Sequence, residues 1–359
     1  MKALRIYAGP QALARMHELG GLRSQDVGAV PAAAGGPKGL VLLRLDQHMF
    51  GEWLPQGGHH VQLVGASIGA WRMATACLSE PVPALQRLEY DYIHQNFEPT
   101  APQRKPTADQ VSEAFAQSLR TFYEGRVQEV LNHQRWHLNV VVSQGQGPLR
   151  RDGRWRTPLG YAAAYLANAV GRQYLGAWLQ RGIFSADLAQ TMPLLPDGMP
   201  THRWALTPNN FMAALQASCS IPFVMKPVHD IAGAPSGAYW DGGITDYHLH
   251  WRYAVGPEQV VLYPHFQRAV VPGWLDKAWR QRHAATAALD NMVVLAPSPD
   301  WVASLPNGKL PDRHDFVHYA NDFKGRVQAW QRAVDESQRL SDEWQAWLAR
   351  PDWSVVSSL

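Results

Sequence analysis

The stretch VGASIGAW, residues 64–71, decides how the rest of this sequence is interpreted. Residues 65–69 fit the Gly-x-Ser-x-Gly pattern, in which a serine stands on a sharp turn between a strand and a helix. The strand-like stretch HHVQLV precedes the pattern and the helix-like stretch AWRMATACL follows it. The Ser67 hydroxyl would then stand at a helix N-terminus, where the helix dipole favours negative charge. Ser67 is therefore either a catalytic nucleophile or a serine on a tight turn without a chemical role.

The sequence around this turn alternates between short apolar runs and helical patterns. Residues 26–34 read as a buried strand before a glycine-rich turn, and residues 39–53 carry apolar side chains at helical spacing. The same order recurs with a strand at 60–64 and a helix at 68–78. Two consecutive strand–turn–helix units predict an α/β fold with a parallel sheet. Later strands are predicted at 136–143 and 260–265.

The remaining apolar periodicity is mostly helical. It predicts helices at 11–24, within 79–134, at 158–181, at 211–218 and, as one charged amphipathic helix, at 321–348. Residues 191–203 predict a loop. No linker clearly divides the chain, and a boundary between residues 67 and 241 would split the candidate site described next. We therefore expect one domain over residues 1–359, with a helical insertion.

The glycine-rich turn at residues 33–40, AAGGPKGL, is suited to binding an anion. Acyl transfer needs amide donors where negative charge develops on the carbonyl oxygen, and a Gly-Gly pair lets bare backbone approach a ligand closely. Pro37 has no N–H, so Gly35 and Gly36 are the expected donors, with Lys38 as a further amide or a point charge. A phosphate-binding loop is the alternative, but the turn lacks the Walker spacing and the Ser/Thr after the lysine.

A carboxylate is expected at the end of a later strand, in the stretch YWDGGITD, residues 239–246. Two apolar residues followed by Asp241-Gly242-Gly243 place an aspartate on a turn. Such an aspartate is either a turn former or a general base. The segment ASCSIP, residues 217–222, precedes it at the end of a predicted helix.

Together these four features resemble the patatin-like phospholipases, a family of lipid acyl hydrolases. They occur in one order over about residues 27–265: the glycine-rich turn, the early Gly-x-Ser-x-Gly, Ala-Ser-x-x-x-Pro, then Asp-Gly-Gly. The resemblance implies a three-layer α/β/α fold with a mostly parallel sheet, followed by a C-terminal helical extension at about 266–359. It also implies a Ser67–Asp241 dyad with Gly35, Gly36 and Lys38 at the oxyanion hole. Ala34 and Lys38 stand where the family usually has Gly and Arg, and Lys loses the planar fork of Arg.

The function expected from this resemblance is a serine acyl hydrolase that cleaves carboxylic esters through an acyl-enzyme. A Ser-His-Asp triad is an alternative, with His248, His250 or His265 as the base. An α/β-hydrolase triad usually has its serine after several strands, whereas Ser67 follows about two. An acyltransferase or a lipid-binding protein on the same fold is a further alternative.

Composition and charge limit the kinds of partner and cofactor that we expect. The 359 residues carry a formal charge of +3 without a Lys/Arg run, so no nucleic-acid partner is expected. Two cysteines, Cys77 and Cys219, cannot form a disulfide framework, and His59-His60 and His248-x-His250 lack a third ligand, so no metal or cofactor is expected. The N-terminus lacks a signal-peptide pattern, and no run of about eighteen apolar residues occurs. We expect a cytoplasmic protein with a lipid or acyl-ester substrate.

One predicted helix is rich in aromatic residues, and its role has more than one interpretation. The predicted helix at 158–181 carries Tyr161, Tyr165, Tyr174 and Trp178 among Ala and Leu. A stripe of this kind most often faces the core. Its alternatives are an acyl pocket or a peripheral contact with a membrane surface.

Overall fold

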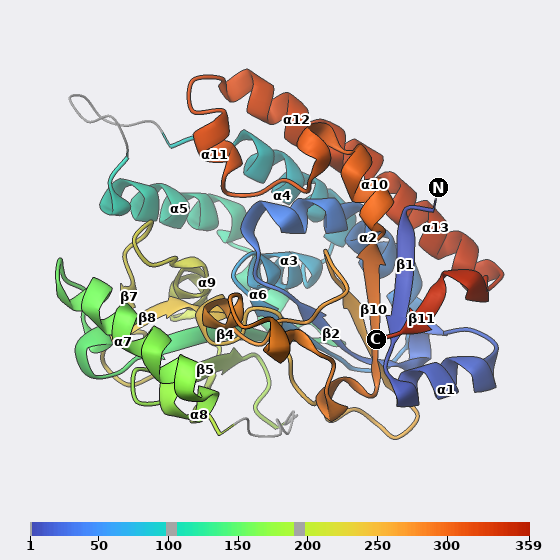
Figure 1. The fold of residues 1–359 in the computed structure, drawn as a ribbon, viewed down its shortest axis with the longest axis horizontal. Coiled ribbons are helices and arrows are strands. Elements are labelled where there is room, and N and C mark those ends of the chain that lie inside the picture. Colours follow the sequence, from blue (N-terminus) through green and yellow to red (C-terminus); the bar gives the residue numbers. More distant parts are fainter. Residues whose placement is uncertain (1, 98–105, 190–197) are drawn as a thin grey trace.

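The fold is organised around a mixed sheet. A computed structural model describes residues 2–97, 106–189 and 198–359 (Figure 1). Within these residues the sheet has 11 strands in the order β11-β1-β10-β9-β2-β3-β4-β5-β6, with β8 paired to β4 and β7 to β8. Antiparallel pairing is confined to β1–β10, β4–β5, β4–β8 and β7–β8. The predicted α/β fold with a mostly parallel central sheet is therefore confirmed.

The strands are short and mostly buried. They are β1 (Leu4–Ala8), β2 (Val27–Ala32), β3 (Val61–Ala66), β4 (Trp136–Gly145), β5 (Leu179–Ser185), β6 (Thr201–Ala205), β7 (Val228–His229), β8 (Ala238–Asp241), β9 (Val260–Pro264), β10 (Met292–Pro297) and β11 (Val356–Ser358).

The helices occupy the connections between these strands. They are α1 (Pro10–Leu19), α2 (Leu43–His48), α3 (Ile68–Ala76), α4 (Pro81–His94), α5 (Ala108–Tyr123), α6 (Val127–Leu131), α7 (Arg156–Val170), α8 (Arg172–Leu175), α9 (Phe211–Cys219), α10 (Pro299–Ser304), α11 (Asp315–His318), α12 (Phe323–Glu336) and α13 (Gln338–Ala349). Of the described helices, none is both long and apolar enough to cross a membrane.

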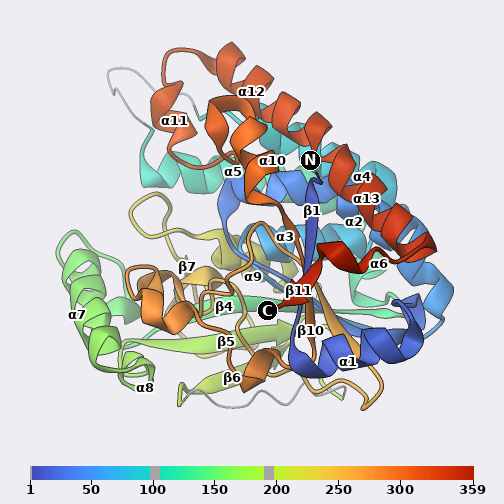
Figure 2. The ribbon, with the colours of Figure 1, turned by 45° about the vertical axis from the view of Figure 1, so that its right-hand side comes forward.

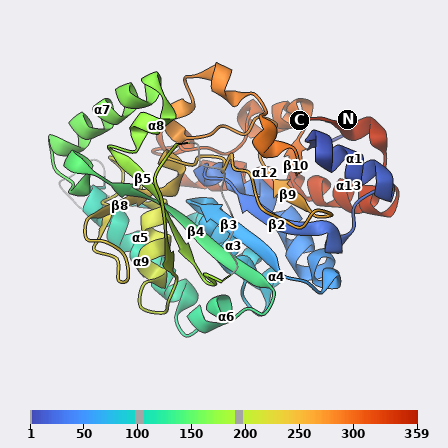
Figure 3. The same cartoon turned by 90° about the horizontal axis from the view of Figure 1, so that it is seen from below.

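Helices cover both faces of the sheet around β8. Successive side chains of a strand point to opposite faces, and in β8 Tyr239 joins the large core beneath α3 and α9, whereas Trp240 joins a second, smaller core with Tyr161 of α7. Figure 3 shows α7 and α8 on one side of β4 and β5, and α3, α5 and α9 on the other. Asp241, the next residue of β8, therefore turns towards the large core and α9.

Most of the predicted elements that lead to the candidate site are confirmed, with shifted ends. The strands predicted at 26–34, 60–64, 136–143 and 260–265 are β2, β3, β4 and β9, and the helices predicted at 11–24, 68–78 and 211–218 are α1, α3 and α9. The predicted helix at 39–53 is instead a succession of a 3₁₀-helix (Gly36–Leu42), α2 and a π-helix (Met49–Trp53). Within 79–134, the described residues form α4, α5 and α6, and residues 98–105 lie outside the described residues.

Several predictions were wrong in ways that matter for the sheet. The predicted helix at 158–181 is instead two helices, α7 and α8, with an extended Gly171 between them, and residues 179–181 begin β5, which pairs with β4. Residues 201–203 of the predicted loop 191–203 belong to β6, and residues 191–197 lie outside the described residues. The helix predicted at 321–348 is two helices, α12 and α13, that meet at Ser337.

The chain ends contribute to the sheet as well. Residues 266–359 were expected as a helical extension, yet they also supply β10 and β11. β10 lies between β1 and β9, and β11 pairs with β1. The segment is therefore part of the central sheet in addition to carrying helices α10–α13.

Candidate active site

Ser67 occupies a strained turn between β3 and α3. Its backbone has φ 57° and ψ −128°, a conformation that costs a non-glycine residue about 1–3 kcal/mol. The flanking glycines make the turn possible, since a Cβ on Gly65 would lie 2.4 Å from Ala70 Cα and one on Gly69 would lie 2.0 Å from the Ala32 carbonyl oxygen. The Gly-x-Ser-x-Gly pattern thus has a steric reason at both glycines.

Strand pairing in the sheet brings Asp241 next to Ser67. β3 pairs with the first part of β4, up to Ala66 opposite Val141, and β8 pairs with the next part, with Asp241 opposite Val142. β3 is parallel to β4 and β8 is antiparallel to it, so the carboxyl ends of β3 and β8 meet along β4. Ser67 Oγ donates a hydrogen bond to Asp241 Oδ2 at 2.7 Å.

Neighbouring groups hold both members of this pair. The Ser67 N–H donates to Ser218 Oγ at 2.9 Å, and Ser218 Oγ donates to the Val141 carbonyl at 2.6 Å. The second oxygen of Asp241, Oδ1, accepts from the Gly243 N–H at 2.7 Å. Ser218 comes from the Ala-Ser-x-x-x-Pro segment, and Gly243 from the Asp-Gly-Gly turn. Three of the four sequence motifs, Gly-x-Ser-x-Gly, Ala-Ser-x-x-x-Pro and Asp-Gly-Gly, therefore contain or directly contact Ser67 and Asp241.

Burial changes the acid–base properties of the aspartate. Ser67 is 3% exposed and Asp241 5% exposed. Burial raises the pKa of Asp241 above its ordinary value, and the charge of Arg313 and the hydrogen bond from Ser67 oppose part of that rise. A carboxylate with a raised pKa is a stronger base than a free aspartate and is better matched to accepting a serine proton.

The glycine-rich turn lies beside the pair. Gly35 has φ 156° and Gly36 has φ 57°, both in the region that favours glycine. A Cβ on Gly243 would lie 2.5 Å from Ala34 Cβ and 3.0 Å from Asp241 Oδ1, so the turn that begins at Ala34 borders the Asp241 carboxylate. The turn that carries Gly35 and Gly36 therefore lies next to the Asp241 turn, and their role as oxyanion donors stays a prediction.

Three cationic side chains lie near the Ser67–Asp241 pair and the glycine-rich turn. Two of them, Lys277 and Arg313, were not predicted from the sequence. Lys38, Lys277 and Arg313 have no described carboxylate within 4.0 Å. Arg313 covers the glycine-rich turn, since its Nε would lie 3.1 Å from a Cβ on Gly36. Lys277 and Arg313 both act on the charge of Asp241. Neither residue belongs to a motif, so only the fold reveals them.

The lysines of this group are partly desolvated. The Lys38 ammonium lies 5.2 Å from the centre of the Phe266 ring, and burial lowers its pKa. Lys277 is exposed as a whole residue, but its ammonium lies 4.1 Å from the centre of the Tyr247 ring. Desolvation, followed by the charges of Lys38 and Arg313, lowers the pKa of Lys277 to about 8. Excess positive charge therefore faces the site.

The candidate triad histidines are engaged elsewhere. His250 forms hydrogen bonds to the Val270 carbonyl at 2.7 Å and to Thr286 Oγ1 at 2.8 Å. Burial lowers the pKa of His265 to about 3 and that of His248 well below its ordinary value, so both rings are neutral. They pack against each other and Phe266. The hydrogen bond of Ser67 goes to Asp241 rather than to a histidine.

Cys219 lies beside the Ser67–Asp241 pair. Burial raises the pKa of the Cys219 thiol well above its ordinary value, and the charge of Asp241 raises it further. Cys219 is therefore a thiol rather than a reactive thiolate. His60 pairs with His137 at 2.7 Å. Across residues 2–97, 106–189 and 198–359, no group of three or more His, Cys, Asp or Glu side chains is arranged to hold a metal ion.

Comparisons with known proteins give distant structural similarity and no sequence relative. No protein-family model matches the sequence. A search of curated proteins finds no match either. Among solved structures, the chain is similar to the crystal structure of VipD from Legionella pneumophila, with a TM-score of 0.36 and 13% sequence identity, over 89% of this chain and 67% of that chain. A similarity of this extent supports no conclusion about activity, which rests on the site itself.

Proposed function

We propose that this protein is a serine acyl hydrolase that cleaves carboxylic esters, with Ser67 as nucleophile and Asp241 as general base. The observation that carries the proposal is the 2.7 Å hydrogen bond from Ser67 Oγ to Asp241 Oδ2 at a buried, strained strand-to-helix turn. The order of motifs that resembles the patatin-like phospholipases supports the same roles.

The reaction divides into two steps. Ser67 Oγ attacks the ester carbonyl carbon while its proton passes to Asp241 Oδ2. The carbonyl oxygen becomes an oxyanion, which the amides of Gly35, Gly36 and Lys38 would stabilise. The carbon–oxygen bond to the alcohol then breaks, and the alcohol leaves with the proton from Asp241. Water then attacks the acyl-enzyme and gives a proton to Asp241. The bond between the acyl carbon and Ser67 Oγ breaks, Asp241 returns that proton to Ser67 Oγ, and the acid leaves.

The cations at the site favour an ester that carries a negative charge near the scissile bond. Lys38, Lys277 and Arg313 are without a described carboxylate partner, so an anionic group of the substrate would supply one. A carboxylate or a phosphate fits this requirement. An acyl ester with such a group, which includes glycerophospholipids, is the substrate class that we propose.

The proposal is tested with a panel of esters of increasing acyl length, offered to the wild-type protein and to Ser67→Ala in parallel. We expect the wild type to hydrolyse at least one chain length, and Ser67→Ala to lose about a thousandfold or more in kcat. Product analysis with added alcohols reports any acyl transfer. Equal turnover by the two proteins would contradict the proposal.

A further inference from the structure

The outer face of α7 carries exposed apolar side chains. The helix buries Thr157, Gly160, Tyr161, Ala164 and Asn168. Its opposite face shows Trp155, at its N-terminal end, at 71% exposure, Leu159 and Leu166 at 66%, and Val170 at 78%. No charged residue occurs between Arg156 and Arg172. A helix that is apolar on its outer face as well as its inner one has a partner other than water.

The apolar surface extends beyond the helix. Tyr174 of α8 is 52% exposed, and Phe223 and Val224 lie alongside at 64% and 47%. Phe223 packs against Tyr161 of α7 with ring centres 5.8 Å apart. We call Trp155, Leu159, Leu166, Val170, Tyr174, Phe223 and Val224 the α7 surface. Figures 1 and 2 show α7 and α8 at the outer edge of the molecule, away from both chain ends.

The backbone at Phe223 is strained. Phe223 has φ 69°, which is a genuine outlier for a bulky residue. Its large apolar side chain is nevertheless 64% exposed. Strain of this kind persists where the surrounding structure imposes it, and it concentrates at functional sites.

Exposed arginines that form no salt bridge with a described residue flank the α7 surface. Arg150, Arg151, Arg154 and Arg156 are all exposed around Trp155, and none forms a salt bridge with a described residue. The nearby acid, Asp152, is engaged by Lys226 at 3.0 Å and by His229 at 3.1 Å. The surface therefore combines an apolar centre with a positive margin.

We infer that the α7 surface docks on a lipid bilayer that contains anionic lipids. An apolar stripe with Trp, Leu and Phe beside a cluster of arginines is the composition of a helix that lies in a membrane interface. The anionic headgroups would pair with the arginines, and the apolar side chains would enter the upper acyl region. A second copy of this chain fits less well, because a twofold contact presents the same surface to itself, and this surface offers the arginines no free acidic partner among the described residues.

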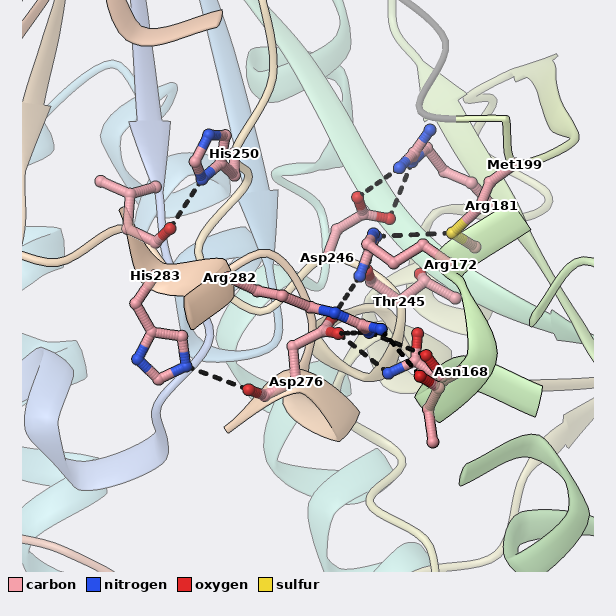
Figure 4. Close-up of polar contacts among 12 residues, drawn as sticks. Asn168, Arg172, Arg181, Met199, Thr245, Asp246, His250, Asp276, Arg282 and His283 are labelled. Atoms are coloured by element: carbon pink, nitrogen blue, oxygen red, sulfur yellow. Dashed lines mark hydrogen bonds and ion pairs between the residues drawn. The ribbon is translucent and has the colours of Figure 1, made fainter. Parts of the chain in front are cut away.

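A chain of hydrogen bonds connects α7 and α8 to the candidate active site. Figure 4 shows Asp276 accepting hydrogen bonds from Asn168 of α7 at 2.9 Å and from Arg282 at 2.7 Å, and pairing with Arg172 of α8. Arg172 also donates to the Thr245 carbonyl at 2.8 Å, on the turn that follows Asp241. A docked α7 would therefore hold the Asp241 turn at a fixed height above the bilayer.

The test uses the full chain with Ser67→Ala, so that no lipid is hydrolysed, and sedimentation with vesicles of phosphatidylcholine or of phosphatidylcholine and phosphatidylserine in equal parts. We expect binding to the mixed vesicles, weaker binding to neutral ones, and loss of binding at high salt. Arg151→Gln with Arg154→Gln should weaken partitioning roughly 25-fold, at about fivefold per arginine. The matched control is Arg332→Gln with Arg350→Gln, on an exposed arginine of α12 and an exposed arginine directly after α13.

The apolar part is tested by a closely matched pair. Val170→Glu replaces a side chain that is 78% exposed, and Val317→Glu replaces one on α11 that is 77% exposed. Val170→Glu should weaken vesicle binding about tenfold or more, whereas Val317→Glu should leave it unchanged. Absence of binding to the mixed vesicles, or equal binding by both variants, would overturn the inference. A dimer in sedimentation velocity that Val170→Glu converts to monomer would also overturn it. These readouts do not depend on ester hydrolysis.

Discussion

Ser67 Oγ donates to Asp241 Oδ2 at 2.7 Å, although 174 positions separate the two residues in the sequence. The contact follows from sheet pairing, because β3 and β8 pair with successive parts of β4 and run in opposite directions. Backbone pairing therefore sets the position of each member, and either side chain can be replaced without displacing the other. This independence makes the pair accessible to single substitutions.

Asp241→Asn should lower activity and raise stability at the same time. The folded-state pKa of Asp241 is raised from 3.8, so the folded chain binds more protons than the unfolded chain between 3.8 and the raised value. Stability contributed by this group is then lost as pH rises through that window, and the loss persists at pH 7. We expect Asp241→Asn to raise Tm at pH 7, with no gain below the unfolded-state pKa, and to lower kcat about a thousandfold.

Scanning calorimetry at several pH values measures this effect. Asp300→Asn, on an exposed aspartate of α10, serves as the control and should leave Tm unchanged. A lower Tm for Asp241→Asn at pH 7 would argue that the carboxylate stabilises the fold, contrary to the raised pKa.

The pH dependence of KM should reveal whether the charge of Lys277 contributes to substrate binding. Its pKa is lowered to about 8, so the ammonium loses its charge as pH rises through 8. For an anionic ester such as para-nitrophenyl hemisuccinate, we expect KM to rise above about pH 8, while KM for para-nitrophenyl butyrate stays level. Lys277→Arg should move the rise to higher pH, because an arginine keeps its charge. The same alkaline rise for both esters would remove Lys277 from substrate binding.

Substitution of Arg313 tests, at neutral pH, whether a positive charge at this position binds the substrate. Its guanidinium lies over Gly36 without a described carboxylate partner, so we expect it to bind the anionic group of the substrate. Arg313→Gln should raise KM for the hemisuccinate about tenfold or more, with little change in kcat, in line with a charged hydrogen bond worth about 1.5 kcal/mol. Arg332→Gln, an exposed arginine on α12, is the control. Steady-state kinetics in which kcat falls and KM does not would indicate a different role.

The sequence alone was sufficient to predict those parts of the site that depend on the conformation of glycines and on the order of the strands. Gly65 and Gly69 are required by contacts under 3 Å, so their spacing around Ser67 carries structural information. The alternation of apolar runs with helical patterns was enough to predict β2, β3, β4 and β9. The proximity of Ser67 and Asp241 was expected from motif order, and the register along β4 supplies the physical reason.

Other features depend on tertiary contacts that no local pattern encodes. β5 begins within a stretch of helical composition because its residues pair with β4. Tyr165 and Tyr174 were expected in the core, yet they are 37% and 52% exposed, because Tyr161 and its neighbours form the buried face. Arg313 and Lys277 reach the site from the C-terminal third of the chain through loops.

Gly69→Ala should destabilise the protein severely. The new Cβ would lie 2.0 Å from the Ala32 carbonyl oxygen, so β2 and α3 would have to separate. We expect a loss of about 3 kcal/mol or more in the free energy of unfolding. Gly153→Ala, whose Cβ would have its nearest neighbour at 3.6 Å, should be tolerated. Chemical denaturation measures both variants, and similar midpoints would show that the turn has room for a methyl group.

The most direct test of the central claim is covalent labelling with a fluorophosphonate probe, read by intact mass and peptide mapping. We expect one adduct on Ser67 in the wild-type protein, much slower labelling in Asp241→Asn, and unchanged labelling in His265→Gln. Labelling at another residue, or no labelling of the folded protein, would contradict the assignment of Ser67 as the nucleophile. Labelling that His265→Gln abolishes and Asp241→Asn preserves would contradict Asp241 as its base.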